Sequence, residues 1–164
     1  MESLLFYIFG GLTVLSIILM IFQANPVASA LFLVFALFCL SALYVILSAP
    51  FIAILQVLVY AGAIMVLFIF VIMLLKLKTA DLIEDRPSWG MAGIVILGLA
   101  SVGFMVFYLL QVPANTFQPV SAGFGEAEGV GRIMFTKYLI PFELTSILLL
   151  ISIVGVVLLG KKEE

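Results

Sequence analysis

Residues 51–75 read FIAILQVLVYAGAIMVLFIFVIMLL and contain no charged side chain. A helix needs about 20 apolar residues to cross the hydrocarbon core of a bilayer. A helix over all of 51–75 would be about 37 Å long, and the core is about 30 Å thick. This segment therefore predicts a membrane-spanning helix that tilts, kinks or changes its winding.

Four further apolar runs lie on either side of this segment. The breaks after the first two runs contain Pro26 and Pro50, and proline favours the first turn of a new helix because it has no N–H to donate. We therefore predict an all-α membrane protein with five transmembrane helices, forming a single integral membrane domain over residues 1–164. Polar loops are expected at about 76–89 and 113–137. The predicted helices are at about 3–22, 27–48, 51–75, 90–112 and 138–160.

The composition excludes several classes of protein. The chain is 66% hydrophobic and 10% charged, with a mean hydropathy of +1.42, whereas soluble domains are roughly half apolar and a quarter charged. These values exclude a soluble enzyme, a nucleic-acid-binding protein and a disulfide-stapled secreted domain. There is no histidine and one cysteine, Cys39, which we expect to be a small buried apolar residue. Because the usual ligands are missing, we expect no haem, zinc, iron–sulfur or other metal site in this chain.

Basic residues indicate the orientation. Five spans place the two ends of the chain on opposite sides of the membrane, and the side with the third loop and the C-terminus carries more lysine and arginine. The positive-inside rule therefore predicts an outside N-terminus and a cytoplasmic C-terminus. The basic residues are Lys76, Lys78, Arg86, Lys161 and Lys162 on the C-terminal side, and Arg132 and Lys137 on the other.

Polar and small residues in the third predicted helix form the first candidate site. Gln56 and Tyr60 are four residues apart, so in an α-helix they share a face. Gly62 falls near the bilayer midplane, and together with Ala61 and Ala63 it forms a narrow belt beside Tyr60. A glycine at this position permits local rewinding of the helix. The alternative is a packing groove for a neighbouring helix, with Tyr60 as a satisfied core tyrosine.

Glu143 is the second candidate, because it is the only carboxylate inside an apolar run. An ionisable group within a membrane is often a proton-handling group. Alternatively, Pro141 marks the start of the last helix, and Glu143 is then a first-turn acid that complements the helix N-terminus.

Two further motifs are interpreted as ordinary structural features. Asn25-Pro26 is expected to be a simple helix break. Gly123-Phe124-Gly125 resembles part of a phosphate loop, but no strand precedes it and no Gly-Lys-Ser follows. We interpret it as part of a flexible connector.

Three segments, 25–27, 56–68 and 138–144, reveal a family resemblance. Through them the chain resembles the subunit J family of NADH-quinone oxidoreductases, the membrane subunits of respiratory complex I. The five-helix layout matches along the chain, and only the loops lack family character. The resemblance implies a non-catalytic core subunit of a redox-driven proton translocase in the bacterial inner membrane. It would couple quinone reduction to proton translocation.

In that family the third helix can carry a π-bulge around the tyrosine-glycine motif, and its winding is linked to opening and closing a water path. The resemblance implies that Tyr60 reorients and that Gly62 tolerates the altered winding. Some members have a glutamate where this chain has Gln56, whose amide cannot titrate. Gln56 and Glu143 are therefore expected to make polar or water contacts.

The resemblance also implies the partners. Flavin, iron–sulfur clusters and quinone are expected on other subunits, with no cofactor bound by this chain. The expected partners are quinone-proximal and antiporter-like membrane subunits and the lipid bilayer, without nucleic acid. The alternative is a structural scaffold subunit of the same complex, or of a related hydrogenase or antiporter complex, without a gating role. A self-sufficient transporter fits poorly, because the chain has no midplane charge and no internal repeat.

Overall fold

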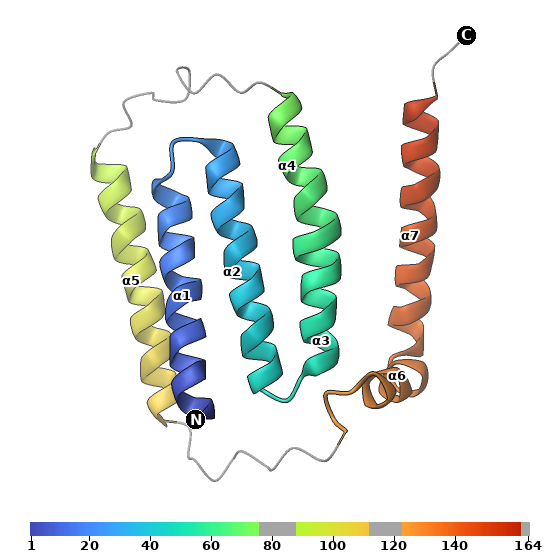
Figure 1. The fold of residues 1–164 in the computed structure, drawn as a ribbon, viewed down its shortest axis with the longest axis horizontal. Helices are drawn as coiled ribbons and strands as arrows, with labels where there is room; N and C mark the ends of the chain where they lie inside the picture. The colour runs from blue at the N-terminus through green and yellow to red at the C-terminus, as the bar shows by residue number, and fades with distance from the viewer. Residues whose placement is uncertain (76–87, 112–122, 162–164) are drawn as a thin grey trace.

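The computed structural model describes residues 1–75, 88–111 and 123–161, and its regular elements in these ranges are all helices (Figure 1). The all-helical architecture predicted from the sequence is therefore confirmed for the described part of the chain. Among these residues, four stretches are long and apolar enough to cross a membrane: Glu2–Phe22, Pro26–Ile46, Pro50–Leu74 and Leu139–Gly160. The elements are α1 (Glu2–Phe22), α2 (Pro26–Ile46), α3 (Pro50–Leu55), η1 (Gln56–Ile64), α4 (Met65–Leu74), α5 (Ser88–Gln111), α6 (Ala127–Thr136) and α7 (Leu139–Gly160).

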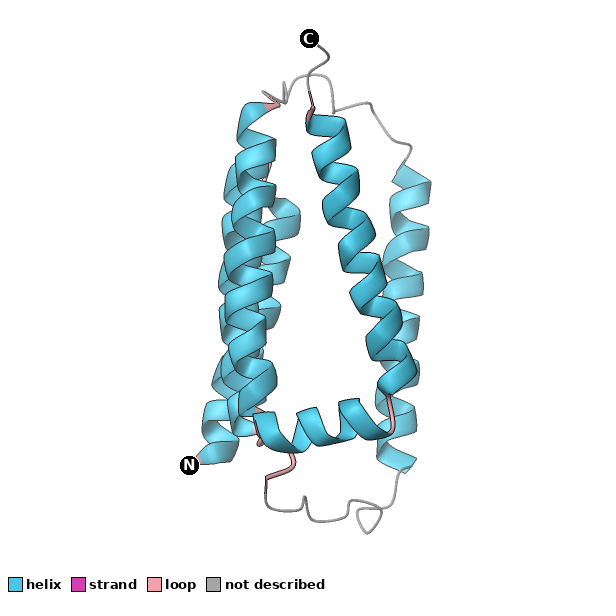
Figure 2. Ribbon diagram, turned by 90° about the vertical axis from the view of Figure 1, so that its right-hand side faces the viewer, coloured by secondary structure: helices cyan, strands magenta, loops and turns pink. Residues whose placement is uncertain are grey.

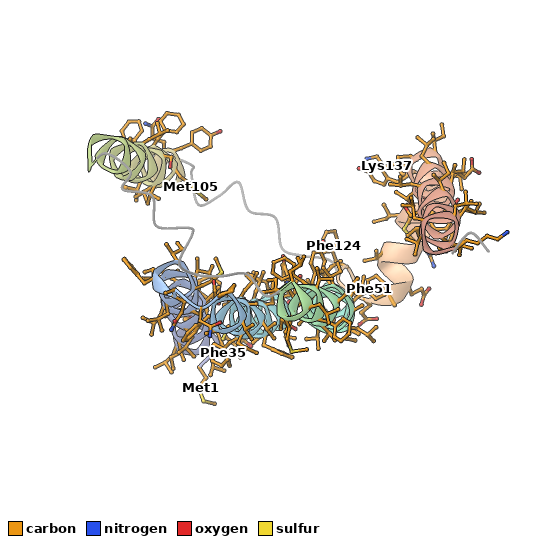
Figure 3. All side chains as sticks on the ribbon, turned by 90° about the horizontal axis from the view of Figure 1, so that it is seen from above. Met1, Phe35, Phe51, Met105, Phe124 and Lys137 are labelled. Carbon is orange, nitrogen blue, oxygen red and sulfur yellow. The ribbon has the colours of Figure 1, made fainter. Side chains whose placement is uncertain are left out.

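The first spans form a row, which Figure 3 shows from above. Helix α1 packs against α2, and α2 packs in turn against the continuous helix formed by α3, η1 and α4. The side chains buried in these contacts are mostly small, which lets helix backbones approach closely in a membrane. Cys39 is buried as predicted. The buried apolar residues are Ala30, Ala36, Cys39, Ala53, Ala61 and Met65.

The turn between α1 and α2 is the helix break predicted at Asn25-Pro26. The Asn25 side-chain oxygen accepts hydrogen bonds from the N–H groups of Val27 at 2.9 Å and Ala28 at 3.4 Å. Pro26 takes the first helical position, where its missing N–H leaves no bond unmade. This N-cap satisfies donors that would otherwise be orphaned at the start of α2.

Helix α6 corrects the polar loop predicted for residues 113–137. Figure 2 shows α6 lying across one end of the spans. Glu128 and Arg132 form an exposed ion pair at 3.1 Å on one side of it, while Val130, Ile133 and Met134 line an apolar groove. An amphipathic helix of this kind suits the membrane interface. The prediction was wrong because two glycines in this segment lower its helix propensity.

The segment before α6 is also ordered, which corrects the flexible connector predicted at Gly123-Phe124-Gly125. Gly123 has a φ of +81°, a conformation that favours glycine. The Gly125 carbonyl accepts a hydrogen bond of 3.1 Å from the Phe51 N–H at the start of α3. A Cβ on Gly125 would overlap the carbonyl oxygen of Ser48, so the backbone approach requires glycine here. Gly123 and Gly125 therefore form an ordered turn that packs against the start of α3.

The loop predicted at 76–89 and the predicted orientation depend in part on residues outside the described ranges. Most of 76–89 lies outside them, and so do four of the basic residues used to assign the orientation. Helix α5 occupies the position of the helix predicted at 90–112. The four basic residues outside the described ranges are Lys76, Lys78, Arg86 and Lys162.

Candidate functional site: a π-helical segment

The third span contains nine residues of π-helix, Gln56–Ile64, between the α-helical segments α3 and α4. In π winding each N–H bonds to the carbonyl five residues back instead of four. At the end of the segment, the Met65 N–H donates to the carbonyls of Tyr60 and Gly62. The altered winding implied for the tyrosine-glycine motif is therefore present in the structure.

The winding determines which residues face α2. The buried residues of this span are Ala53, Gln56, Ala61 and Met65, and they are separated by three, five and four positions. An α-helix repeats its face every three or four residues. The five-residue step from Gln56 to Ala61 coincides with the π segment, so the winding places these two residues on one packed face.

Tyr60 lies elsewhere, which corrects the shared face predicted for Gln56 and Tyr60. The Gln56 side chain is 6% exposed, whereas Tyr60 is 53% exposed on the outer side of the span. The prediction assumed α winding, in which the residue at i+4 returns to the same face. In π winding the residue at i+5 returns instead, so Ala61 takes the place expected for Tyr60.

The three small residues predicted to form a belt, Ala61, Gly62 and Ala63, differ in how far they are buried. Ala61 is buried, Gly62 is half-buried and Ala63 is exposed. A Cβ built on Gly62 would lie 3.2 Å from the carbonyl oxygen of Val57, five residues earlier. That spacing is the π-helical register, so any larger residue at position 62 crowds a carbonyl of the π segment itself.

The return from π to α winding passes over one carbonyl. The Met65 N–H bonds to the carbonyls of Tyr60 and Gly62, on either side of Ala61. The Ala61 carbonyl, in a buried residue, therefore does not accept the Met65 N–H as it would in continuous α winding.

Glu143 is not brought together with the π segment. It is the fifth residue of α7, and its side chain is exposed. Because α7 begins at Leu139, two residues before Pro141, Glu143 lies beyond the first turn. The interpretation of Glu143 as a first-turn acid is therefore wrong.

Sequence reasoning did not single out Ser41. Its hydroxyl donates a 2.9 Å hydrogen bond to the carbonyl of Ala53, just before the π segment, and both residues are buried. The available signal was a hydroxyl within the apolar run of the second helix, which needs a partner in a membrane.

The described residues hold no group of three or more histidine, cysteine, aspartate or glutamate side chains that could bind a metal. The apolar groove beside α6 has a volume of about 440 Å³ and lies between α6 and the first turns of α3 and α7. Tyr138 is its one titratable lining residue.

Comparison with known proteins identifies the family. The model of NADH-ubiquinone/plastoquinone oxidoreductase chain 6 matches residues 16–159. The chain belongs to this family. NADH-quinone oxidoreductase subunit J of Pseudomonas aeruginosa is 38% identical, with 96% of both chains covered. The Escherichia coli K12 subunit J is 34% identical, with 97% of this chain and 86% of that protein covered.

The chain 6 family also extends to chloroplasts. Subunit 6 of the chloroplastic NAD(P)H-quinone oxidoreductase of Physcomitrium patens is 31% identical and matches 100% of this chain and 86% of its own length. Together with the apolar helices, the bacterial relatives confirm a multi-pass protein of the bacterial inner membrane and a subunit of NADH-quinone oxidoreductase. The predicted family resemblance is therefore confirmed.

Proposed function

We propose that this chain is a non-catalytic membrane-arm subunit that couples quinone reduction to proton translocation by switching the winding of its third span. The observation that supports this proposal is the π segment Gln56–Ile64 within an otherwise α-helical span. The π-helix is rare, and π-bulges inside α-helices are frequently found at functional sites. A short stretch with two accessible windings is a bistable element of the kind that couples distant sites.

The two windings expose different side chains to α2. In π winding, Ala61 shares the buried face with Gln56. In α winding, Tyr60 would occupy that place, because it lies four residues after Gln56. Rewinding would therefore exchange a methyl group for a phenol next to the Gln56 amide. The phenol hydroxyl and the amide can then hydrogen-bond water, while neither needs to change its charge.

The Ala61 carbonyl supplies a second difference between the states. In continuous α winding it would accept the Met65 N–H, and in π winding that N–H bonds elsewhere. The π state therefore offers water an acceptor that the α state withdraws. We infer that the hydration of this region changes with winding, which makes it a gate for a water path.

The topology and partners of the proposed subunit follow the sequence. Helix α5 is the fourth span in chain order and brings the total to five; the N-terminus lies outside and the C-terminus is cytoplasmic. Flavin, iron–sulfur clusters and quinone belong to other subunits, and quinone-proximal and antiporter-like subunits are the neighbours. Gln56 orients water, and Glu143 makes polar or water contacts at the surface of α7.

The test is a comparison of the third span in the assembled complex at rest and during turnover. We expect Gln56–Ile64 to be π-helical in one condition and α-helical in part of the population in the other. The gate would be refuted if a complex that pumps normally had the same π winding at rest and during turnover, with Tyr60 unmoved and no ordered water near Ala61.

A scaffold role is the second candidate, and the buried alanine face toward α2 favours it. If the span only packs, substitutions at Gly62 should lower the amount of complex recovered. Quinone turnover and proton translocation per assembled complex would then stay unchanged. If the span is a gate, the same substitutions lower translocation in complexes that assemble normally.

A further inference from the structure

Ser41 makes an unusual hydrogen bond for a hydroxyl in a membrane-spanning helix. Its Oγ donates at 2.9 Å to the Ala53 carbonyl of a different helix, and the two residues are 8% and 3% exposed. Most other serine and threonine hydroxyls in the described residues donate to a carbonyl three or four positions earlier in their own helix. These are Thr13, Ser16, Ser101, Thr136, Thr145, Ser146 and Ser152.

The acceptor lies at the junction where the winding changes. Ala53 is three residues before Gln56, the first residue of the π segment. The Gln56 N–H divides its hydrogen bond between the carbonyls of Ala53 and Ile52. The main-chain bond to Ala53 is therefore shared, and Ser41 gives this carbonyl a second donor from outside the helix.

A donor on a neighbouring helix restricts the main chain at that point. If π winding extended toward the N-terminus past Ala53, the Ala53 carbonyl would turn about the helix axis and away from Ser41. The hydroxyl and the carbonyl would then be unpaired in a buried site, which is unfavourable. The bond thus opposes movement of the boundary in this direction.

We propose that Ser41 is a positioning residue that fixes the N-terminal boundary of the π segment at Gln56. A π segment can shift along a helix by exchanging hydrogen bonds, and its position decides which side chains face α2. By fixing the boundary, Ser41 keeps Ala61 and Gln56 on the packed face. Its effect on proton translocation rests on the proposed function, whereas its effect on the boundary does not.

The chain offers a matched control for the test. Ser29 is also on α2, and its hydroxyl donates at 2.9 Å to the Met20 carbonyl of α1. Ser29→Ala therefore removes the same kind of bond from the same helix, away from the π segment. Ser41→Thr keeps the hydroxyl, and Ser41→Cys keeps the volume with a much weaker donor.

The experiment determines the structure of the assembled resting complex with each variant, and classifies individual particles by where the π segment begins. In Ser41→Ala, we expect registers that begin before Gln56 to become about threefold to tenfold more populated, which corresponds to the loss of one such hydrogen bond. Ser29→Ala and Ser41→Thr should keep the boundary at Gln56. If Ser41→Ala does not assemble, Ser41→Cys provides the same measurement. A boundary that stays at Gln56 in the variant measured would overturn the inference.

Proton translocation per quinone reduced separates this inference from the proposed function. If the boundary shifts and translocation falls only in the Ser41→Ala complex, both are supported. A shifted boundary with unchanged translocation refutes the gate but supports the positioning role of Ser41. If the boundary stays at Gln56 in the Ser41→Ala complex, while the wild-type span changes its winding during turnover, only the role of Ser41 is refuted.

Discussion

Substitution of Gly62 by alanine perturbs the π segment directly. The added Cβ would lie 3.2 Å from the Val57 carbonyl oxygen, which is too close for an ordinary contact, so the backbone must give by a few tenths of an ångström. The general helix-forming advantage of alanine applies to both windings. The crowding arises in the π register, where the carbonyl five residues back approaches position 62.

The magnitude follows from the size of this overlap. Forcing one extra methyl group into a packed site costs about 1–3 kcal/mol, and a small overlap belongs at the low end. A cost of about 1 kcal/mol changes the ratio of two states roughly fivefold. We therefore expect Gly62→Ala to lower the ratio of π to α winding about fivefold in the resting complex.

The assay measures three quantities on the same membranes. These are quinone-linked electron transfer, proton translocation per quinone reduced, and electron transfer from NADH to a water-soluble acceptor that bypasses quinone. Gly62→Ala should lower the first two and leave the third unchanged. Gly10→Ala is the control, because a Cβ on Gly10 of α1 meets nothing within 4 Å. A Gly62→Ala complex that keeps its π segment and pumps like the control would refute the reasoning.

Four more substitutions probe other features. Tyr60→Phe should leave assembly intact, since the side chain is 53% exposed, and should lower proton translocation; normal pumping would argue against a gating phenol. Gly125→Ala should reduce the complex recovered from membranes, because the new Cβ overlaps the Ser48 carbonyl, whereas Gly131→Ala has open space and should not. Glu143→Gln should assemble, since the side chain is exposed, but translocate fewer protons per quinone reduced; unchanged translocation would contradict a proton-handling role for this carboxylate. Asn25→Ala should lower the melting temperature of the complex through the loss of about 1 kcal/mol of capping energy, and Asn25→Ser should retain it.

The course of the chain could be predicted largely from hydropathy. The apolar runs and the prolines at 26 and 50 determine where helices begin and end, and these signals are local. The amphipathic helix α6 was missed because its glycines weaken the propensity signal. The ordered turn at Gly125 was missed because it depends on Ser48 and Phe51, far away in the sequence.

The site was predictable in composition but not in geometry. Tyr60, Gly62 and Gln56 stood out because polar groups and glycine are conspicuous in an uncharged span. Their faces were assigned by α-helical periodicity, which does not apply within Gln56–Ile64. Hydrogen bonds that reach five residues back instead of four exchange Tyr60 for Ala61 on the buried face. Gly62 permits such a change and the family resemblance implies one, but no local pattern in 51–75 specifies which residues it exchanges. The bond from Ser41 to Ala53 that accompanies it is tertiary.

The unburied surface of α7 has a consequence for biogenesis. None of its apolar window is buried by the described part of this chain, whereas the two helices at the N-terminus pack on each other. During synthesis the first two helices emerge early and can pack against each other in the bilayer. We expect the last helix to obtain its lateral contacts from other polypeptides of the complex. We therefore expect the lifetime of newly made chains to depend on how quickly the neighbouring subunits are supplied.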